Sequence, residues 1–387
     1  MTAEQRRQNL KTIWQAALAA VSGEQAVRHA IEADIEADIK ADTTFQPDQI
    51  IAIGKAAVGM CRGALHSYPN CNALVVTKYQ HADTDLLRKS NLRVIEAAHP
   101  IPDQQSLVAG AAILDCVRQL PTHSELLLLV SGGASALAES LPNHKSLADL
   151  QAITNAMIAS GKTIDEINQT RKTLSLLKDG KLLAAFGGAK ARVYAISDVE
   201  GDGIATIGSG IGDCHRATVP TQSSIIASNQ IARQGAVTAA QALGLTIRHN
   251  AESLYGDVFD LASMIGKQLT APAAQPGVYI WGGEPTITLP ENPGCGGRNQ
   301  TLALATAEHL LNQAHITLLV AGTDGSDGPT DAAGGLVDQH TFIDAVNARQ
   351  RLRAADAGTY LAQHNSLFVT GPTHTNVMDL AIAIVGE

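Results

Sequence analysis

Charged residues stand on glycine-rich loops of this chain, directly after short apolar runs typical of β-strands. Lys55 follows IIAIG, where a lysine has no role in a core, although it could also be a solvated surface charge. The loop GTDGSDGPTD follows TLLVA and places Asp324, Asp327 and Asp331 close together. Carboxylates this close repel one another, so a cation is expected to offset them. Lysine and acids on such loops suit an anionic ligand handled with a metal ion, and phosphoryl transfer is the first chemistry that they indicate.

A second loop, SGGASAL, follows the apolar run LLLLV and could bind an anion. Gly132 and Gly133 allow backbone N–H groups to converge on a ligand, and Ser131 and Ser135 can add hydroxyl donors. The alternative is an ordinary strand-to-helix turn that needs small residues for packing. On its own this signal is weak.

The loop GCGGRNQ repeats the same arrangement later in the chain and opens a helix-like run. It contains Gly296 and Gly297 and places Arg298 at the helix N-terminus, the end whose dipole favours anions. An arginine contradicts simple dipole complementarity at that end. We therefore expect Arg298 to grip a bound anion in bidentate fashion.

The aspartates of GTDGSDGPTD also have a conformational explanation, because Asp and Gly dominate turns. The loop lacks the final glutamate of an EF-hand, so a calcium loop is rejected. A magnesium ion held partly by substrate phosphates, or a lysine or arginine from across a cleft, suits these acids better. Asp198 and Asp202 in SDVEGDG form a second, weaker acidic group. The fragment SGKT at 160–163 lacks the first glycine of a P-loop, and Gly161 is expected to cap a helix instead.

Apolar runs and helical patterns alternate along the chain, which is typical of a parallel sheet with crossover helices. The carboxyl ends of parallel strands meet at one edge of such a sheet, where ligands bind. We expect strands over residues 50–53, 73–76, 92–96, 126–130, 193–196, 224–227, 246–248, 278–281, 317–321 and 366–370. We expect helices over residues 56–66, 104–119, 147–159, 164–178, 230–242, 256–268 and 299–311.

The length of the chain predicts two domains, because 387 residues exceed the size at which one core stops growing. The segment LTAPAAQPG at 269–277 is the expected linker, since two prolines and small residues interrupt the pattern. This division predicts an N-terminal domain over 1–268 and a C-terminal domain over 277–387. Both are expected to be Rossmann-like α/β domains with mostly parallel sheets. The segment 222–268 could pack with either side.

Composition excludes several classes of protein. The net charge of −9 argues against nucleic acid or an anionic membrane as a partner. The 5 cysteines form no CxxC pair, so neither a disulfide framework nor a zinc site is indicated, and a cytoplasmic protein is expected. The first residues lack the apolar core of a signal peptide, and no stretch is apolar for long enough to span a bilayer. A homodimer is compatible with the sequence, which does not determine the oligomeric state.

An ordered series of motifs carries a family resemblance. The motifs are IAIGKAAVGM, AAHPIPDQQS, LLVSGGASAL, INQTRKTLSLLKDGKL, GGEPTITL, GCGGRNQ and GTDGSDGPTDAAGG. Together they resemble the glycerate 2-kinase family, whose members are often labelled hydroxypyruvate reductases and whose C-terminal portion is known as the MOFRL domain. The resemblance runs from about residue 48 to the end of the chain, and so many ordered motifs make it specific. It implies two α/β domains, with ATP, Mg²⁺ and D-glycerate meeting in a cleft between them.

The resemblance also implies which residues form the active site. These are Lys55, Arg298 and the aspartates of GTDGSDGPTD, with Glu284 and Asp198 nearby. The SGGAS loop would hold a phosphate or the substrate carboxylate through its backbone N–H groups. Lys55 and Arg298 come from opposite sides of the expected linker, which predicts an active-site cleft between the domains. Closure of that cleft would bring both cations onto one anion and exclude water.

The expected mechanism transfers the γ-phosphoryl group of ATP in line to the 2-hydroxyl of D-glycerate, a short hydroxy acid. Most of the rate enhancement would come from positioning and charge neutralisation. Lys55 and Arg298 would neutralise the transferring group or hold the substrate carboxylate. One aspartate, Asp324 or Asp327, would accept the hydroxyl proton or position Mg²⁺, and the sequence leaves this choice open.

Some positions depart from the family pattern. Ala134 stands where a glycine is usual in the SGGAS motif, and Thr173 stands where a histidine is usual. The larger departure is GSGIGDCHRA at 208–217, which lacks a usual proline, so we expect the phosphate or substrate contacts of that loop to differ. His99 precedes Pro100, and it either lines the substrate site or braces its loop.

Two other functions remain as alternatives. An NAD(P)-dependent hydroxypyruvate reductase would need a dinucleotide fingerprint followed by an acid about twenty residues later, and no such fingerprint follows a strand. A non-catalytic anion-binding protein would have no need of clustered aspartates beside basic loops. Oxidation of NADH tests the first alternative, and nucleotide turnover tests the second.

Overall fold

The computed structural model describes residues 1–82, 85, 88–160 and 164–386 as two compact units. One unit is Ser22–Ser228, which we call the Lys55 unit. The other joins Met1–Val21 to Asn229–Glu387, and we call it the Arg298 unit. No helix among the described residues is long and apolar enough to cross a membrane. Lys162 and its neighbours in SGKT lie outside the described residues, so the expected cap at Gly161 remains a prediction.

The Lys55 unit is built on a six-stranded parallel sheet in the order β3-β2-β1-β4-β5-β6. This is the strand order of the doubly wound dinucleotide-binding fold, in which ligands bind where the order reverses, between β1 and β4. β1 and β4 are apolar and buried, as strands covered on both faces must be. The strands are β1 (Gln49–Ile53), β2 (Asn72–Lys78), β3 (Leu92–Ala97), β4 (Glu125–Val130), β5 (Lys190–Ile196) and β6 (Thr221–Ala227).

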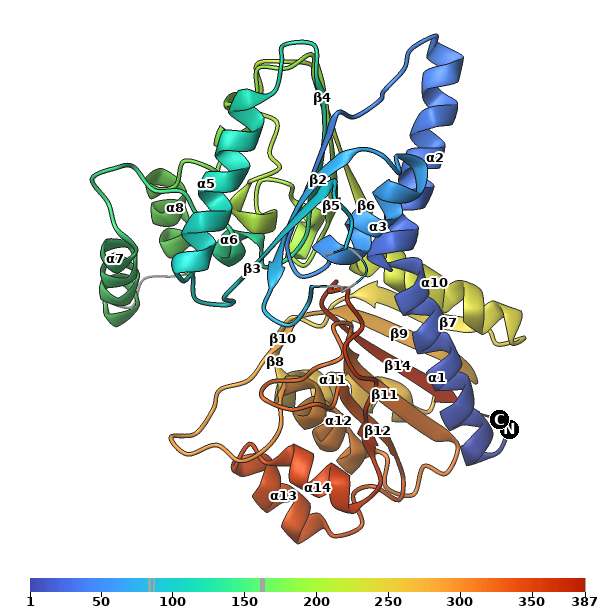
Figure 1. Ribbon diagram of the computed structural model, residues 1–387. Helices are drawn as coiled ribbons and strands as arrows, with labels where there is room; N and C mark the ends of the chain where they lie inside the picture. The colour runs from blue at the N-terminus through green and yellow to red at the C-terminus, as the bar shows by residue number, and fades with distance from the viewer. Residues whose placement is uncertain (83–84, 86–87, 161–163, 387) are drawn as a thin grey trace. The chain divides into compact units, whose positions relative to one another are not determined.

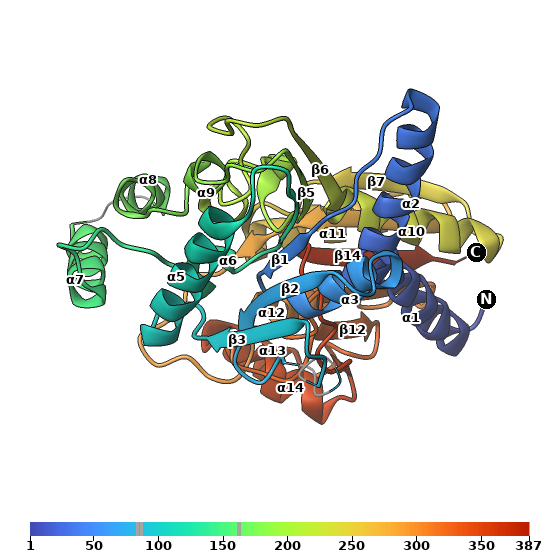
Figure 2. The same ribbon diagram turned by 45° about the horizontal axis from the view of Figure 1, so that its top comes forward.

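Helices cover both faces of this sheet. α2 and α3 pack on one side, and α5 and α6 lie on the other (Figure 1). α7 and α8 pack against each other, away from the sheet of their own unit (Figure 2). The helices are α2 (Gly23–Ala41), α3 (Ala57–Ser67), α5 (Gln104–Gln119), α6 (Ala134–Leu137), α7 (Leu147–Ala159), α8 (Ile164–Leu174) and α9 (Lys181–Ala184), with 3₁₀ turns η1 (Glu200–Asp202) and η2 (Ile207–Ser209).

The Arg298 unit contains a second six-stranded sheet, in the order β13-β12-β11-β14-β9-β7. Within the described strands of this sheet, only β7 and β9 pair in parallel, and the other four pairs are antiparallel. The strands are β7 (Ile247–Glu252), β9 (Gly277–Gly283), β11 (Ile316–Gly322), β12 (Gly334–Asp338), β13 (Leu367–Phe368) and β14 (Asp379–Val385). β8 (Gly256–Asp257) and β10 (Pro285–Thr286) form a separate two-stranded ladder.

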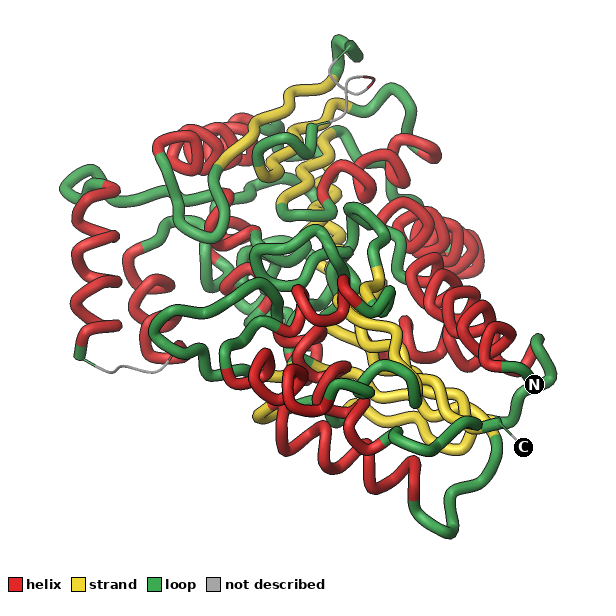
Figure 3. Tube along the Cα trace, turned by 90° about the horizontal axis from the view of Figure 1, so that it is seen from below, coloured by secondary structure: helices red, strands yellow, loops and turns green. Residues whose placement is uncertain are grey.

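α1 and α10 pack on one face of this sheet, and α12 packs on the other together with α11, α13 and α14 (Figure 1). The apolar positions Leu10, Ile13 and Trp14 form the buried face of α1, as the helical spacing predicts. The two ends of the chain lie close together in this unit (Figure 3). The helices are α1 (Ala3–Ala20), α10 (Asn229–Ala242), α11 (Val258–Thr270), α12 (Arg298–His309), α13 (Ala345–Arg353) and α14 (Ala357–Gln363).

The expectation of mostly parallel sheets is therefore correct for the Lys55 unit and wrong for the Arg298 unit. The chain enters β12 from β11 through a loop, without the crossover helix that a parallel pair requires. β12 and β14 also lie outside the expected strands. The two glycines that begin β12 weaken a strand pattern, and β14 is a continuous apolar run whose periodicity does not separate strand from helix.

The compact units also differ from the expected division at 269–277. That segment connects α11 to β9 inside the Arg298 unit. β7 pairs with β9 in the sheet, and α10 packs on both strands, so this part of the chain belongs with the C-terminal portion. α1 joins the same unit because it packs along α10.

Candidate functional sites

The Lys55 site begins where β1 and β4 end side by side. Ile53 pairs with Val130, so the loops that follow the two strands start next to each other. The N–H of Lys55 donates to the carbonyl oxygen of Gly132 at 2.9 Å, which ties the loops together. Gly54 adopts a φ of +129°, and a Cβ there would lie 2.1 Å from Ser131 Oγ. Only glycine therefore allows the two loops to approach this closely.

Ser131 has a structural role in this arrangement. Its side chain is buried, and its hydroxyl accepts a hydrogen bond from the N–H of Ala56 at 3.1 Å. The same hydroxyl lies 3.5 Å from the carbonyl oxygen of Ile53, to which it donates. Ser131 was expected to supply a donor to a ligand, but the structure shows its hydroxyl engaged within the protein.

Three side chains meet at the two glycines of the SGG sequence. A Cβ on Gly133 would lie 3.2 Å from Lys55 Cγ and 3.1 Å from His99 Cδ2. A Cβ on Gly132 would lie 1.9 Å from Asp198 Oδ2. Among the described residues, the N–H groups of Gly132 and Gly133 donate no hydrogen bond to another protein group. The unused backbone donors and the Lys55 side chain suit a bound anion, whereas the Asp198 carboxylate beside Gly132 would repel one unless a cation or proton offsets its charge.

His99 is neutral in this environment. Burial, and then the positive charges of Lys55 and Lys78, lower the pKa of His99 to about 4. A neutral imidazole has one N–H donor and one acceptor nitrogen, so it can orient a polar ligand without adding charge. His99 was left without a defined role by the sequence, and the structure places it beside Lys55.

Ser135 connects the SGGAS loop to the segment that departs from the family pattern. Ser135 Oγ lies 2.8 Å from Ser209 Oγ. A Cβ on Gly208, which has a φ of +56°, would lie 2.9 Å from Ala134 Cβ. The alanine at 134 thus packs directly against Gly208, so the two departures from the family pattern are neighbours in space. The N–H of Gly180 donates to the carbonyl oxygen of Gly210 at 2.8 Å, which anchors the far side of this segment.

A buried ion pair lies close to the same loop. Lys178 and Glu139 are 1% and 0% exposed, and the Lys178 ammonium donates to the Glu139 carboxylate. Burial lowers the pKa of Lys178, and the Glu139 carboxylate opposes this change. Glu139 follows α6 and accepts from the N–H of Ser140, so the pair ties the end of α6 to the LKDGK turn.

The Arg298 site is assembled at one edge of the second sheet. β9 and β11 both run antiparallel to β14, which lies between them. Asp379, the first residue of β14, therefore pairs with Gly283 at the end of β9 and with Gly322 at the end of β11. The loops that carry Glu284 and the acidic motif begin at this edge. Asp379 is not among the expected site residues, and its signal in the sequence is an acid directly before the apolar run LAIAIV.

Arg298 is held by two carboxylates of its own unit. Its Nε lies 2.6 Å from Asp379 Oδ2, and its Nη1 lies 2.9 Å from Glu284 Oε1. Burial opposes the charge of Arg298, but Asp379 and then Glu284 more than offset this effect and hold its pKa above the usual value. Burial also raises the pKa of Asp379, and the Arg298 guanidinium opposes this rise. About a third of Arg298 stays exposed, which leaves part of its guanidinium accessible.

Asp327 is the anion at the N-terminus of α12. Its side chain is 3% exposed, and it accepts the N–H groups of Asn299 at 3.0 Å and Gln300 at 2.7 Å. Burial raises the pKa of Asp327 to about 6, against the effect of these two hydrogen bonds. A Cβ on Gly297 would lie 2.3 Å from Asp327 Oδ1. The helix end that was expected to bind a ligand anion is therefore capped by the protein's own carboxylate.

Gly296 likewise serves internal packing. It adopts a φ of +153°, and a Cβ there would lie 3.0 Å from the backbone nitrogen of Gly358, at the start of α14. The glycines of GCGGRNQ thus allow the loop to pack against Asp327 and α14.

Asp324 differs from Asp327 although it lies in the same loop. It is half-buried, and its Oδ1 accepts from the N–H and the hydroxyl of Ser326 at 3.0 and 3.1 Å. Its Oδ2 makes no hydrogen bond within the described part of the chain. Asp331 is exposed. No three His, Cys, Asp or Glu side chains of the described residues gather closely enough to hold a metal ion by themselves.

The structure thus brings the expected site residues together in two groups. Lys55, Gly132, Gly133, Ser135 and Asp198 belong to the Lys55 unit, and Glu284, Gly296, Gly297, Arg298, Asp324 and Asp327 belong to the Arg298 unit. Each group is described within its own unit. The expectation that Lys55 and Arg298 share one cleft remains a prediction.

Two family models match the chain. Residues 9–243 match a domain described as a domain of unknown function, DUF4147, and residues 277–379 match the MOFRL family. The chain is 32% identical to a glycerate 2-kinase of Pyrococcus horikoshii, over 87% of both chains. It is also 32% identical to a D-glycerate 2-kinase of Thermotoga maritima, over 87% of this chain and 90% of that protein.

A solved structure confirms the fold. The crystal structure of glycerate kinase from Thermotoga maritima superimposes with a TM-score of 0.86 at 29% sequence identity. The superposition covers 99% of this chain and 100% of that chain. The expected α/β class and the family resemblance are both confirmed by these comparisons.

Proposed function

Because the chain belongs to the glycerate 2-kinase family, we propose that it transfers the γ-phosphoryl group of ATP to the 2-hydroxyl of D-glycerate, with Mg²⁺ as the metal ion. The observation that carries this proposal is the Lys55 site. There, a lysine and unused backbone N–H groups stand where the strand order of a doubly wound sheet reverses. This is the position at which such folds bind phosphorylated ligands.

Lys55 and the SGG loop would bind the transferring phosphoryl group or the substrate carboxylate. Phosphoryl transfer leaves little covalent work to the protein, so fixed positive charge and fixed N–H donors supply most of the stabilisation. His99 supports this assignment, because a neutral imidazole beside Lys55 can orient the bound anion through a hydrogen bond without adding charge. Arg298 would act as the second cation of the reaction through the exposed part of its guanidinium.

Asp324 fits the metal better than Asp327 does. Asp324 keeps one carboxylate oxygen without a hydrogen bond among the described residues, whereas both oxygens of Asp327 accept N–H groups of α12. One or two carboxylates with substrate phosphates and water are the usual ligands of Mg²⁺ in such enzymes, which agrees with the lack of a three-acid cluster in the described chain. When bound, Mg²⁺ would neutralise charge on the phosphate oxygens. Asp327 would then keep the loop in place.

One reaction mixture tests the proposal. Purified protein with Mg²⁺-ATP and D-glycerate should release ADP, and phosphorus NMR should identify 2-phosphoglycerate as the product. Omission of Mg²⁺ should abolish the turnover. A 3-phosphorylated product would remove the assignment of the 2-hydroxyl, and no ADP above background would remove the kinase assignment.

The reductase alternative has a structural objection. In a doubly wound dinucleotide site, an acid at the end of the second strand usually binds the ribose. Here β2 ends at Lys78, and the loop after β1 reads GKAAVG. We expect no oxidation of NADH by hydroxypyruvate, which absorbance measures directly.

A further inference from the structure

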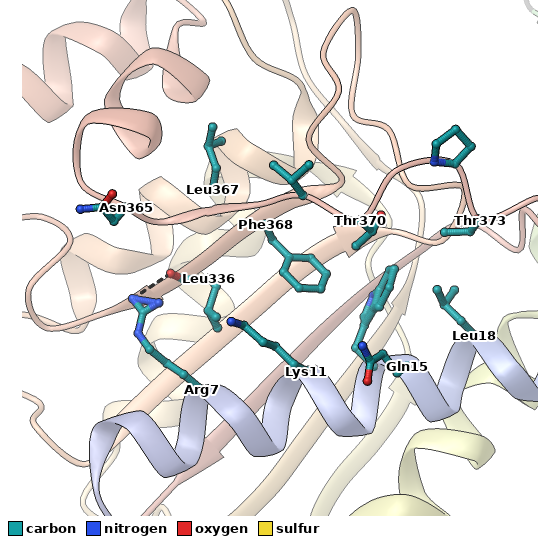
Figure 4. Close-up of a pocket in the computed structure, with 13 residues that line it drawn as sticks. Arg7, Lys11, Gln15, Leu18, Leu336, Asn365, Leu367, Phe368, Thr370 and Thr373 are labelled. Atoms are coloured by element: carbon teal, nitrogen blue, oxygen red, sulfur yellow. Dashed lines mark hydrogen bonds between the residues drawn. The ribbon is translucent and has the colours of Figure 1, made fainter.

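A pocket in the Arg298 unit opens between α1 and the segment that contains β13 (Figure 4). Its volume is about 680 Å³, which is within the range of small-molecule sites. None of the residues assigned to the phosphoryl-transfer reaction lines it. The pocket therefore needs an explanation of its own.

The pocket is positively charged in a chain that carries a net charge of −9. Its charged lining residues are Arg7 and Lys11, and no acidic side chain lines it. Arg7 forms an ion pair with Asp338, with Nε 3.0 Å from Oδ2, and its Nη2 donates to the carbonyl oxygen of Leu336 at 3.1 Å. Its charge is therefore partly offset within the protein. Lys11 follows one helical turn later, and within the described chain its ammonium has neither an ion pair nor a hydrogen bond.

The two cations point from α1 toward the same space, which apolar side chains border on the opposite side (Figure 4). Phe368 and Leu336 form this wall, and Trp14 of α1 packs against Phe368 from the helix side. Trp14 and Phe368 make an edge-to-face contact with ring centroids 5.0 Å apart, so the wall is rigid and aromatic. A small inorganic anion would leave this apolar surface uncovered.

We propose that this pocket binds an organic anion, a carboxylate or phosphate carried on an aromatic or alkyl body. Lys11 and Arg7 bind the anionic group, and the wall around Phe368 covers the apolar body. Lys11 supplies a charge without an ion pair for the anionic group of the ligand. The apolar side chains around Phe368 supply the surface that would cover the ligand's body.

The far wall of the pocket is bonded to the acidic loop. The Thr373 hydroxyl donates to the carbonyl oxygen of Thr323 at 2.6 Å, and the N–H of Thr373 donates to the carbonyl oxygen of Asp324 at 3.3 Å. A Cβ on Gly325 would lie 3.0 Å from Thr370 Oγ1, so the wall and the loop are in close contact. A ligand that orders Thr370 and Thr373 therefore also orders the loop that carries Asp324.

Fluorescence with anilinonaphthalene sulfonate, an aromatic anion, tests the site without use of any catalytic activity. Wild-type protein should bind this probe at one saturable site, and octanoate should displace it whereas inorganic phosphate should not. Lys11→Glu should weaken binding by about tenfold or more. Lys267→Glu makes the same change on an exposed lysine of α11 in the same unit, and it should leave the affinity unchanged.

Two further measurements test the pocket by means other than a change of surface charge. Leu18→Trp fills the pocket without a change of charge and should also abolish probe binding. Hydrogen exchange at residues 323–327 should slow when the probe binds to wild-type protein and stay unchanged in Lys11→Glu. Equal affinity of the Lys11→Glu and Lys267→Glu variants, or binding that does not saturate, would overturn the proposal.

Discussion

The two glycine-rich loops of this protein look alike in sequence and differ in structure. In SGGAS, the N–H groups of Gly132 and Gly133 are unused among the described residues, and Lys55, His99 and Asp198 surround them. In GCGGRNQ, the glycines make room for Asp327 and for the start of α14, and Asp327 accepts the N–H groups of the helix end. The first loop keeps backbone N–H donors that no described protein group uses, whereas the second is occupied by the protein itself.

This difference shows what a glycine-rich loop at a helix N-terminus does and does not indicate. Such a loop predicts that an anion lies at the helix end, because unpaired N–H groups collect there. It does not say whether the anion is a substrate or a side chain. At α12 the anion is the carboxylate of Asp327. Arg298 forms ion pairs with Asp379 and Glu284 instead of binding an anion at the helix end.

Because the SGGAS loop keeps its backbone donors, we expect the largest loss of activity when Lys55 beside it is replaced. Lys55→Ala should lower kcat/KM for D-glycerate by roughly 10²- to 10³-fold, the loss typical when one group that stabilises transition-state charge is removed. Steady-state kinetics measure the effect, and Lys40→Ala, on an exposed position of α2, is the matched control. A Lys55→Ala enzyme as active as Lys40→Ala would mean that Lys55 and the SGGAS loop are not part of the active site.

The two aspartates of the acidic loop should separate stability from activity. Asp327→Ala should lower the free energy of unfolding by about 1–3 kcal/mol, because two buried N–H groups of α12 lose their acceptor. Asp324→Ala should change that free energy by less than about 0.5 kcal/mol, since its side chain is only half-buried.

Urea denaturation measures both free energies, and ADP release measures activity. Asp324→Ala should lose most of its kinase activity while it keeps the wild-type stability. If instead Asp324→Ala is the less stable variant and keeps its activity, the roles assigned to the two carboxylates are reversed.

A third expected effect concerns the pH dependence of stability through His99. Its pKa falls from 6.5 to about 4 on folding, so the unfolded chain binds a proton that the folded chain does not bind between these values. The stability that comes from neutral His99 is complete above pH 6.5 and is lost as the pH falls through 4. His99→Gln should therefore make the free energy of unfolding less dependent on pH across this window. An unchanged slope in urea titrations at several pH values would contradict a buried neutral imidazole at this site.

Local sequence patterns were sufficient to predict the strands and the site loops of the Lys55 unit. The sequences IIAIGK and LLLLVSGG each contain a buried strand and the loop that leaves it, and parallel strands bring such loops to one edge of the sheet. The expected strands of this unit match the observed ones to within a few residues, and the site residues on them meet at the SGG loop. His99 also occurs in a motif that the sequence singled out, although its neighbour Lys55 gives it its neutral state.

The sheet and the site of the Arg298 unit depended on contacts between distant parts of the chain. Asp379 meets Arg298 because β14 inserts between β9 and β11, and no local pattern specifies which strand fills that place or in which direction. The same holds for α1, which joins residues at the other end of the chain because its apolar face needs α10 and the second sheet. The amino-acid pattern thus determines which loops carry charge and which strands precede them. Long-range strand pairing and burial determine which of those charges remain open to a ligand, because only the folded chain brings a carboxylate such as Asp327 to the helix end that it satisfies.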